Sequence, residues 1–197
     1  DEMFDEVPKY VDYCLEAFNA ARVITNDAIA LIEEKIDLTE FIPDGFGSCD
    51  NIIIADGTME VTDLKYGKGV PVYAIENKQL MLYGLGALLK YGILYDITTV
   101  RLSVIQPRID NFSSWEISAQ ELLEWANTEL KEKAKLAFEG LGELQVGDWC
   151  KFCSVKNRCR LLAEENLKVA KYDFAKPEIL TDEEIADILT RAPKLAE

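Results

Sequence analysis

Hydrophobic and polar residues alternate with two different periods along this chain, and each period predicts one type of element. Residues 3–22 have apolar residues three or four positions apart, which predicts an amphipathic helix. The apolar residues of that helix are Phe4, Val7, Val11, Cys14 and Phe18. Residues 28–37 and 50–65 alternate with the shorter period, and the second range contains a turn signal, so together they predict three strands.

The following residues predict a second set of helices and strands. Asn77 is expected to cap a helix that continues to about Tyr91 and is apolar on nearly all sides, as a buried helix is. Residues 98–107 and 115–117 are expected to pair as strands, and the capping-box sequence at 118–121 starts another helix. This order of elements predicts one α/β domain with a mixed central sheet flanked by helices.

The turn signal Asp56-Gly57 sets a strand register that places two acids opposite each other. Asp-Gly is typical of a two-residue hairpin turn whose central residues both have positive φ. If this turn closes the hairpin, Asp50 lies opposite Asp63, with Lys65 two residues further along the same face. Opposed side chains have β-carbons about 4.5–5.5 Å apart, and like charges at that distance destabilise a sheet. We therefore expect a proton or a divalent cation between the two carboxylates.

Residues at this end of the hairpin have the chemistry of a metal-dependent site. The carboxylates of Asp50 and Asp63 and the Leu64 carbonyl are oxygen ligands, which suit Mg²⁺ or Mn²⁺. Lys65 can hold an attacking water or stabilise negative charge on a phosphate. A solvent-facing hairpin with ordinary surface charges is the other interpretation of the same residues.

Gln79 and Tyr83 are a second pair of candidates, because residues four apart share one face of a helix. A glutamine in an apolar helix needs a hydrogen-bond partner. One expectation is that Gln79 and Tyr83 contact the acidic hairpin. The other is that Gln79 is buried in the core with its amide hydrogen-bonded, and that Tyr83 only packs beside it.

Composition narrows the function classes further. The chain has 197 residues, a formal net charge of −15 and no histidine, so carboxylates, lysine, tyrosine and cysteine must carry any chemistry. The negative charge argues against nonspecific nucleic-acid binding over the whole surface, although it leaves room for a local cationic groove. No apolar run approaches the roughly 20 residues of a membrane span, and three of the five cysteines are clustered. We expect a cytoplasmic protein with no membrane partner.

Cys150, Cys153 and Cys159 form the cysteine cluster. Clustered thiolates suit an iron–sulfur cluster or zinc, and either site needs a fourth ligand. Cys14 lies on the apolar face of a helix and is expected to be a core residue, and Cys49 is expected on the sheet face opposite Asp50. Three reduced cysteines in a small loop are the alternative.

These motifs together resemble a known family. Gly47-x-x-Asp50, Asp63-x-Lys65 and Gln79-x-x-x-Tyr83 resemble the RecB-like branch of the PD-(D/E)XK nucleases, and the cysteine spacing is similar to that of its CRISPR-associated 4Fe–4S exonucleases. The run Ile105-Gln106-Pro107-Arg108 is similar to phage and prophage proteins of this type.

The resemblance, which covers about residues 28–165, implies a restriction-endonuclease-like core at 1–147, a cysteine module packed on it at 148–165 and a helical tail at 166–197. It implies a metal-dependent deoxyribonuclease, an exonuclease in phage DNA recombination that has DNA and phage recombination proteins as partners. Asp50, Asp63 and the Leu64 carbonyl would bind metal, Lys65 would be the catalytic lysine, and Gln79 and Tyr83 would position the lysine or the DNA.

Two departures from the family leave alternatives open. Its members often supply a further acid or histidine from an upstream helix, and Glu33 and Glu34 are the nearest acids here. A [4Fe–4S] cluster needs a fourth cysteine, so either an N-terminal segment is missing or the cluster has been lost. A catalytically inactive or assembly-dependent DNA-binding module on the same fold is the main rival function, and a metal-stabilised interaction domain is a third.

Overall fold

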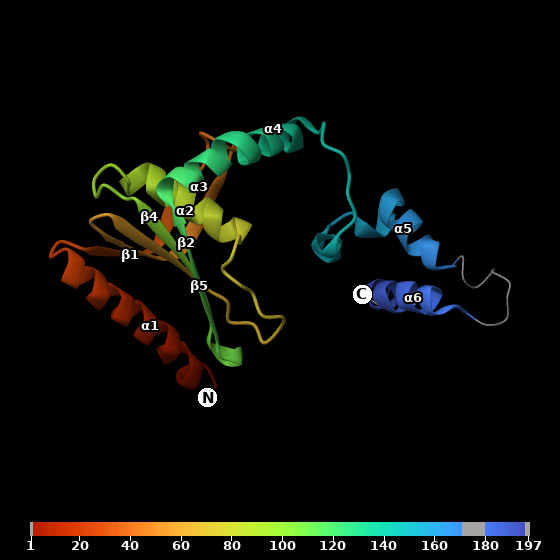
Figure 1. Cartoon of the computed structure of the whole chain (residues 1–197), viewed down its shortest axis with the longest axis horizontal. Helices are drawn as coiled ribbons and strands as arrows, with labels where there is room; N and C mark the ends of the chain where they lie inside the picture. Colours follow the sequence, from red (N-terminus) through yellow and green to blue (C-terminus); the bar gives the residue numbers. More distant parts are fainter. Residues whose placement is uncertain (1, 171–179, 196–197) are drawn as a thin grey trace. The chain divides into compact units, whose positions relative to one another are not determined.

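The computed structural model describes residues 2–170 and 180–195 (Figure 1). Its contacts divide the chain into two compact units, Asp1–Leu141 and Gly142–Glu197. None of the helices in the described ranges is both long and apolar enough to cross a bilayer.

The first unit is built on a five-stranded sheet whose strands lie side by side in chain order. The strands are β1 (Ile29–Asp37), β2 (Phe46–Ala55), β3 (Thr58–Leu64), β4 (Thr99–Gln106) and β5 (Asn111–Ser118). All neighbours are antiparallel except β3 and β4, which are parallel and are joined through helix α2 (Lys78–Tyr91). The predicted mixed α/β fold, a central sheet with helices on it, is confirmed.

The β2–β3 turn lies where the sequence places it, but its backbone differs from the expected one. Ala55 pairs with Thr58, as predicted. Only the second central residue, Gly57, has positive φ (77°), and Asp56 does not. The Gly57 N–H donates to the Tyr95 carbonyl at 2.8 Å, so the loop before β4 helps to set the turn conformation.

Helix α2 covers the apolar face of the hairpin. Ile52, Ile54, Met59 and Val61 are all fully buried in one core cluster with the inner residues of α2, as the alternation predicts. Asn77 caps the helix by accepting a hydrogen bond from the Leu80 N–H at 3.2 Å. A Cβ atom at Gly86 would lie 1.8 Å from Ile36, so glycine allows the helix to approach the sheet closely.

Strand alternation is interrupted near the start of the hairpin. Glu33 has φ 54°, and it falls opposite Asp50 because its two neighbours pair with Asn51 and Cys49. Cys49 is fully buried in the same core cluster as Ile52, three residues further along, so strict side-chain alternation does not hold in this part of β2. A left-handed residue in β1 shifts the side-chain parity of the strand, which an alternation rule alone does not foresee.

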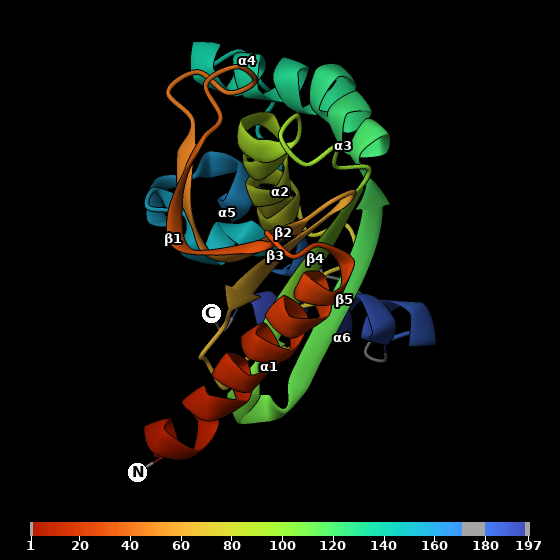
Figure 2. The same cartoon turned by 90° about the vertical axis from the view of Figure 1, so that its left-hand side faces the viewer.

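Helix α1 (Glu2–Ile24) crosses the other face of the sheet (Figure 2). The helix is where the sequence predicts it, and part of the predicted apolar stripe faces the sheet: Val7, Cys14 and Phe18 are half-buried, whereas Phe4 is 80% exposed. The Tyr13 hydroxyl contacts Glu60 at 2.7 Å and Ser103 at 3.0 Å. The sheet surface under α1 is therefore mixed, because Phe18 packs against the cluster that contains Ile53 and Ala55 while Tyr13 meets polar side chains.

The first unit ends with a helical stretch of three segments, and the second unit is helical. The stretch comprises α3 (Ala119–Trp125), the π-helical segment η2 (Ala126–Leu130) and α4 (Lys131–Glu139). Its predicted capping box is present between Ser118 and Glu121. The second unit contains η3 (Asp148–Phe152), η4 (Lys156–Arg158), α5 (Arg160–Ala170) and α6 (Asp182–Leu195).

Candidate functional site

The two hairpin acids lie where β2 and β3 stop pairing. The paired residues extend from Ala55 and Thr58 to Asn51 and Thr62, and the next step of this register brings Asp50 to Asp63. Asp50 Oδ2 accepts a hydrogen bond from the Leu64 N–H at 2.8 Å. The side chain of Asp50 thus takes the place of a backbone partner for β3, which holds its carboxylate beside the end of that strand.

Three side chains continue from Asp63 in one line of polar contacts. Lys65 Nζ lies 2.8 Å from Asp63 Oδ2 and donates to Gln79 Oε1 at 3.0 Å. Gln79 Nε2 then donates to the Tyr83 hydroxyl at 3.0 Å. Because an ammonium group only donates, the Gln79 oxygen must face Lys65 and its nitrogen must face Tyr83. The structure therefore brings together the predicted residues of β3 and α2.

Gln79 is exposed, so it is not the buried core amide that formed one of the two expectations for this helix. Its hydrogen bonds to Lys65 and Tyr83 are made at the surface, where a ligand can reach them. Gly47 closes this side of the site, because a Cβ atom there would lie 2.8 Å from the Tyr83 ring.

Asp63 is the buried acid of the site and is only 4% exposed. Burial raises the pKa of its carboxyl, the Lys65 ammonium opposes that shift, and the negative charge of Asp50 adds to it. Lys65 Nζ lies 2.8 Å from its Oδ2 and is the ion-pair partner of that atom. A buried carboxylate beside a second acid fits a cation ligand, because a divalent cation would compensate two negative charges where one ammonium compensates one.

The affinity for a divalent cation should depend on pH because the Asp63 carboxyl is buried and has a raised pKa. A cation competes with the proton, so we expect the affinity for Mn²⁺ to fall as the pH drops through the raised pKa of Asp63. Without metal, the folded state takes up the proton more readily than the unfolded state. The contribution of Asp63 to stability is therefore fully present below its ordinary pKa and is lost as the pH rises through the folded pKa. Mn²⁺ titrations from about pH 4 to about pH 8 check this, and a pH-independent affinity would contradict it.

One of the two expected upstream acids lies away from this line of side chains. Glu34 accepts hydrogen bonds from Lys90 and from the Tyr91 hydroxyl, at the far end of α2 from Gln79. Lys90 follows Gln79 by eleven positions in the helix, which is about 16 Å along the axis. Glu33 lies in the strand position opposite Asp50, with its side chain exposed.

Helix α1 supplies polar groups that the sequence analysis missed. Burial raises the pKa of the Tyr10 phenol, with smaller contributions from Cys14 and from the negative charge of Asp50, so Tyr10 lies near that carboxylate. Glu6 lies one turn before Tyr10, and its Oε2 is buried without a hydrogen bond, 2.9 Å from Lys9 Nζ. Glu6, Tyr10 and Tyr13 share a helical stripe with Cys14, and of these four residues the predicted apolar stripe contained only Cys14.

The loop after β4 adds a second cation to this end of the sheet. Because β3 and β4 are parallel, their carboxyl ends adjoin, and the Lys65 N–H donates to the Ile105 carbonyl at 2.9 Å. Arg108 donates to the Tyr66 carbonyl at 3.3 Å, and its guanidinium carbon lies 4.9 Å from the centre of the Tyr66 ring. The segment after the catalytic candidate Lys65 is thus held by an arginine.

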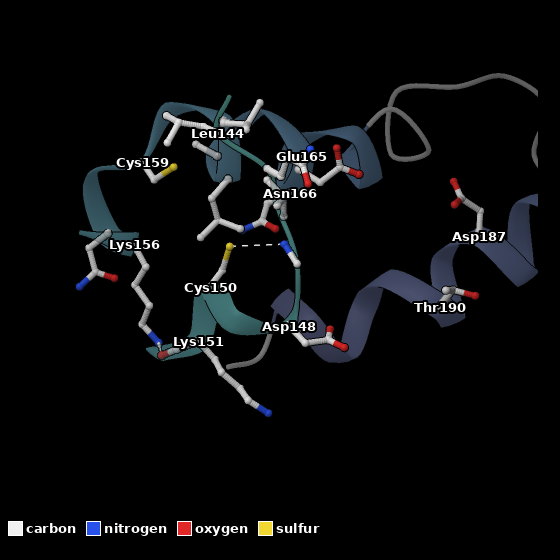
Figure 3. A pocket seen from close by; sticks show the side chains of 17 residues that line it. Leu144, Asp148, Cys150, Lys151, Lys156, Cys159, Glu165, Asn166, Asp187 and Thr190 are labelled. Carbon is white, nitrogen blue, oxygen red and sulfur yellow. Dashed lines mark hydrogen bonds between the residues drawn. The ribbon is translucent and has the colours of Figure 1, made fainter. Parts of the chain in front are cut away.

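The cysteine cluster lines a cavity of about 930 Å³ within the second unit (Figure 3). Cys150 and Cys159 lie in its wall, whereas Cys153 is exposed. The Gly147 N–H approaches Cys150 Sγ at 3.5 Å. Across the described ranges, no group of three or more His, Cys, Asp or Glu side chains is arranged to hold a metal. The acidic pair Asp50 and Asp63 contains two such side chains, fewer than the three that this definition of a group requires.

Comparisons with known proteins give a family and distant structural likenesses. The chain is similar to a solved structure described as "Crystal structure of SSO0001", with 17% sequence identity and a TM-score of 0.35. The similarity covers 75% of this chain and 67% of the other. A family model described as "Protein of unknown function (DUF2800)" matches residues 1–197. The chain therefore belongs to the DUF2800 family.

Proposed function

We propose that this protein is a metal-dependent deoxyribonuclease of the RecB-like PD-(D/E)XK type with a restriction-endonuclease-like core. The observation that carries the proposal is the line from Asp63 through Lys65 and Gln79 to Tyr83, next to a second carboxylate at Asp50. Its resemblance to phage proteins favours an exonuclease that acts in recombination or DNA processing.

The acids would bind the cation and the lysine would act on the substrate. Asp50, Asp63 and the Leu64 carbonyl would hold a divalent cation, which supplies a more acidic water and neutralises charge on the phosphate. Hydrolysis adds a water oxygen to phosphorus while an ester P–O bond breaks, and the leaving oxygen takes up a proton. Lys65 is placed to donate to a phosphate oxygen and to offset the negative charge that grows in the transition state.

Gln79 and Tyr83 would act by holding the lysine. Gln79 accepts a hydrogen bond from Lys65 and donates one to Tyr83, so the ammonium is restrained without losing its charge. Such restraint matters because misplacement of a catalytic group by about 1 Å can cost about 100-fold in rate.

Cleavage of end-labelled linear DNA by the purified full chain tests the proposal. We expect cleavage with Mg²⁺ or Mn²⁺ and none with EDTA, on single-stranded or on double-stranded substrate. If neither substrate is cleaved with either metal, the nuclease proposal fails.

A catalytically inactive or assembly-dependent DNA-binding module on the same fold is the second candidate, which the lack of a fourth cysteine beside Cys150, Cys153 and Cys159 favours. For this candidate, retention of the labelled DNA in a gel without any cleavage is the expected result. Metal-dependent cleavage would exclude it.

The iron–sulfur cluster stays a prediction based on Cys150, Cys153 and Cys159. Analysis of iron and acid-labile sulfide in anaerobically prepared full-length protein tests it. About four iron atoms per chain would support a [4Fe–4S] cluster, and the absence of both elements would refute it.

A further inference from the structure

The segment between β3 and α2 is held in place by side chains rather than by strand pairing. We call residues Tyr66–Glu76 the strap. It has no regular secondary structure, and it joins Lys65 to the helix that carries Gln79. Within the strap, Ala74 is buried while its neighbours Tyr73 and Ile75 are exposed, as in an extended chain with one face inward.

Gln106 makes the central contact with the strap. It is the last residue of β4 and is only 3% exposed. Its Oε1 accepts from the Val72 N–H at 2.6 Å and from Asn111 Nδ2 at 2.7 Å, and its Nε2 donates to the Val70 carbonyl at 3.5 Å. A buried amide with these partners fixes the strap, since a buried polar group that loses its partner is left unsatisfied and destabilises the folded state.

Asn111 and Ser113 on β5 complete the attachment. Asn111 Nδ2 donates to the Val72 carbonyl at 2.9 Å, and the Ala74 N–H donates to Ser113 Oγ at 3.0 Å. Both backbone polar groups of Val72 are thus bonded by side chains, as a neighbouring strand would otherwise do. The strap therefore has one defined path from β3 to α2.

We infer that Gln106 and Asn111 are positioning residues that set the Lys65–Gln79 contact through the strap. The two ends of the strap carry the two partners of the 3.0 Å hydrogen bond between Lys65 and Gln79. A change in the strap path alters the distance between its ends, and Lys65 has to meet Gln79 within hydrogen-bond reach. The expected effect on catalysis rests on the proposed function. The expected effect on the Lys65–Gln79 hydrogen bond does not, and it can be measured in a protein without activity.

The test compares Gln106→Met with Ser103→Ala in the full chain. Methionine keeps the volume of Gln106 but removes its amide. Ser103 is a buried polar residue of the same strand, and it bonds to Tyr13 and Glu60 on the α1 face. Lys65 is followed by its ¹³Cε signal, assigned with Lys65→Arg, and Gln79 by its side-chain amide signal. Asn111→Ala is a second strap variant in case Gln106→Met does not fold.

We expect both strap variants to move the Lys65 and Gln79 signals toward the positions of side chains without this hydrogen bond. Tyr83→Phe is a further control: it removes the hydroxyl that bonds to Gln79 and should leave the Lys65 signal in place. We also expect kcat for DNA cleavage to fall about 10–100-fold with KM changed less than about 3-fold. Ser103→Ala should leave both readouts unchanged. Unmoved Lys65 and Gln79 signals in the folded strap variants would overturn the inference. Shifted signals in a protein that never cleaves DNA would support it while refuting the nuclease proposal.

Discussion

Replacing Asp63 by asparagine should reduce metal-dependent DNA cleavage at least about 10³-fold, because the change removes a cation ligand worth several kcal/mol in the transition state. Asparagine keeps the size of the side chain, and Asp63 lies in a buried position where larger changes would disturb packing. Rates of cleavage of labelled linear DNA at saturating Mn²⁺ measure the effect.

The metal-free Asp63→Asn variant should lose cleavage without losing thermal stability. This combination separates loss of function from loss of fold. Burial disfavours the charged form of Asp63, and this is the main reason that its pKa is raised. The metal-free Asp63→Asn variant should therefore unfold at the same temperature as the native protein or at a higher one. Mn²⁺ at about 100 times the Kd of the native protein should stabilise that protein by about 2.7 kcal/mol, and the same concentration should stabilise Asp63→Asn clearly less.

Asp56→Asn is the matched control for this prediction. Asp56 is an exposed aspartate in the turn of the same hairpin, far along the strands from the site. Its variant should keep both cleavage and the Mn²⁺ effect. Full cleavage by Asp63→Asn would remove Asp63 from the site, and equal losses in both variants would point to general damage of the hairpin.

Replacing Lys65 by methionine should lower kcat for cleavage about 10²–10³-fold, the usual cost of losing one group that stabilises transition-state charge. Methionine keeps most of the aliphatic chain but leaves Asp63 without its ion-pair partner and Gln79 without its donor. Binding of DNA should persist, because the phosphate backbone makes its other contacts elsewhere.

Lys65→Met should also bind Mn²⁺, which distinguishes the lysine from the acids. The variant still has both carboxylates, and it no longer has a competing cation beside Asp63. Lys35→Met is the control, because Lys35 is an exposed lysine on β1. Unchanged kcat in Lys65→Met, with Lys35→Met equally active, would exclude the assigned catalytic function.

Much of the site could be predicted because short-range rules determine it. The turn at Gly57 sets the register, and the register alone brings Asp50 to Asp63. Helical spacing then explains why Gln79 and Tyr83 share one face, and the capping residue Asn77 sets where that helix starts.

The features that the sequence did not predict depend on contacts between residues far apart in the chain, and such contacts leave no pattern in the neighbouring residues. The face of α1 was set by the polar sheet surface around Glu60 and Ser103, which belong to strands far along the chain. The strap has no periodic pattern, and its path depends on Gln106 and Asn111. The positive φ of Glu33, which nothing in the residue type favours, lies where strand alternation breaks and Cys49 is buried in the core.

A titration with Mn²⁺, followed by the loss of its free-ion electron paramagnetic resonance signal, tests the central claim most directly. The account predicts tight binding to the native protein and to Asp56→Asn, and binding weakened at least about tenfold in Asp63→Asn. Equal Mn²⁺ binding by the native protein and Asp63→Asn would contradict the claim that these hairpin carboxylates form a metal site.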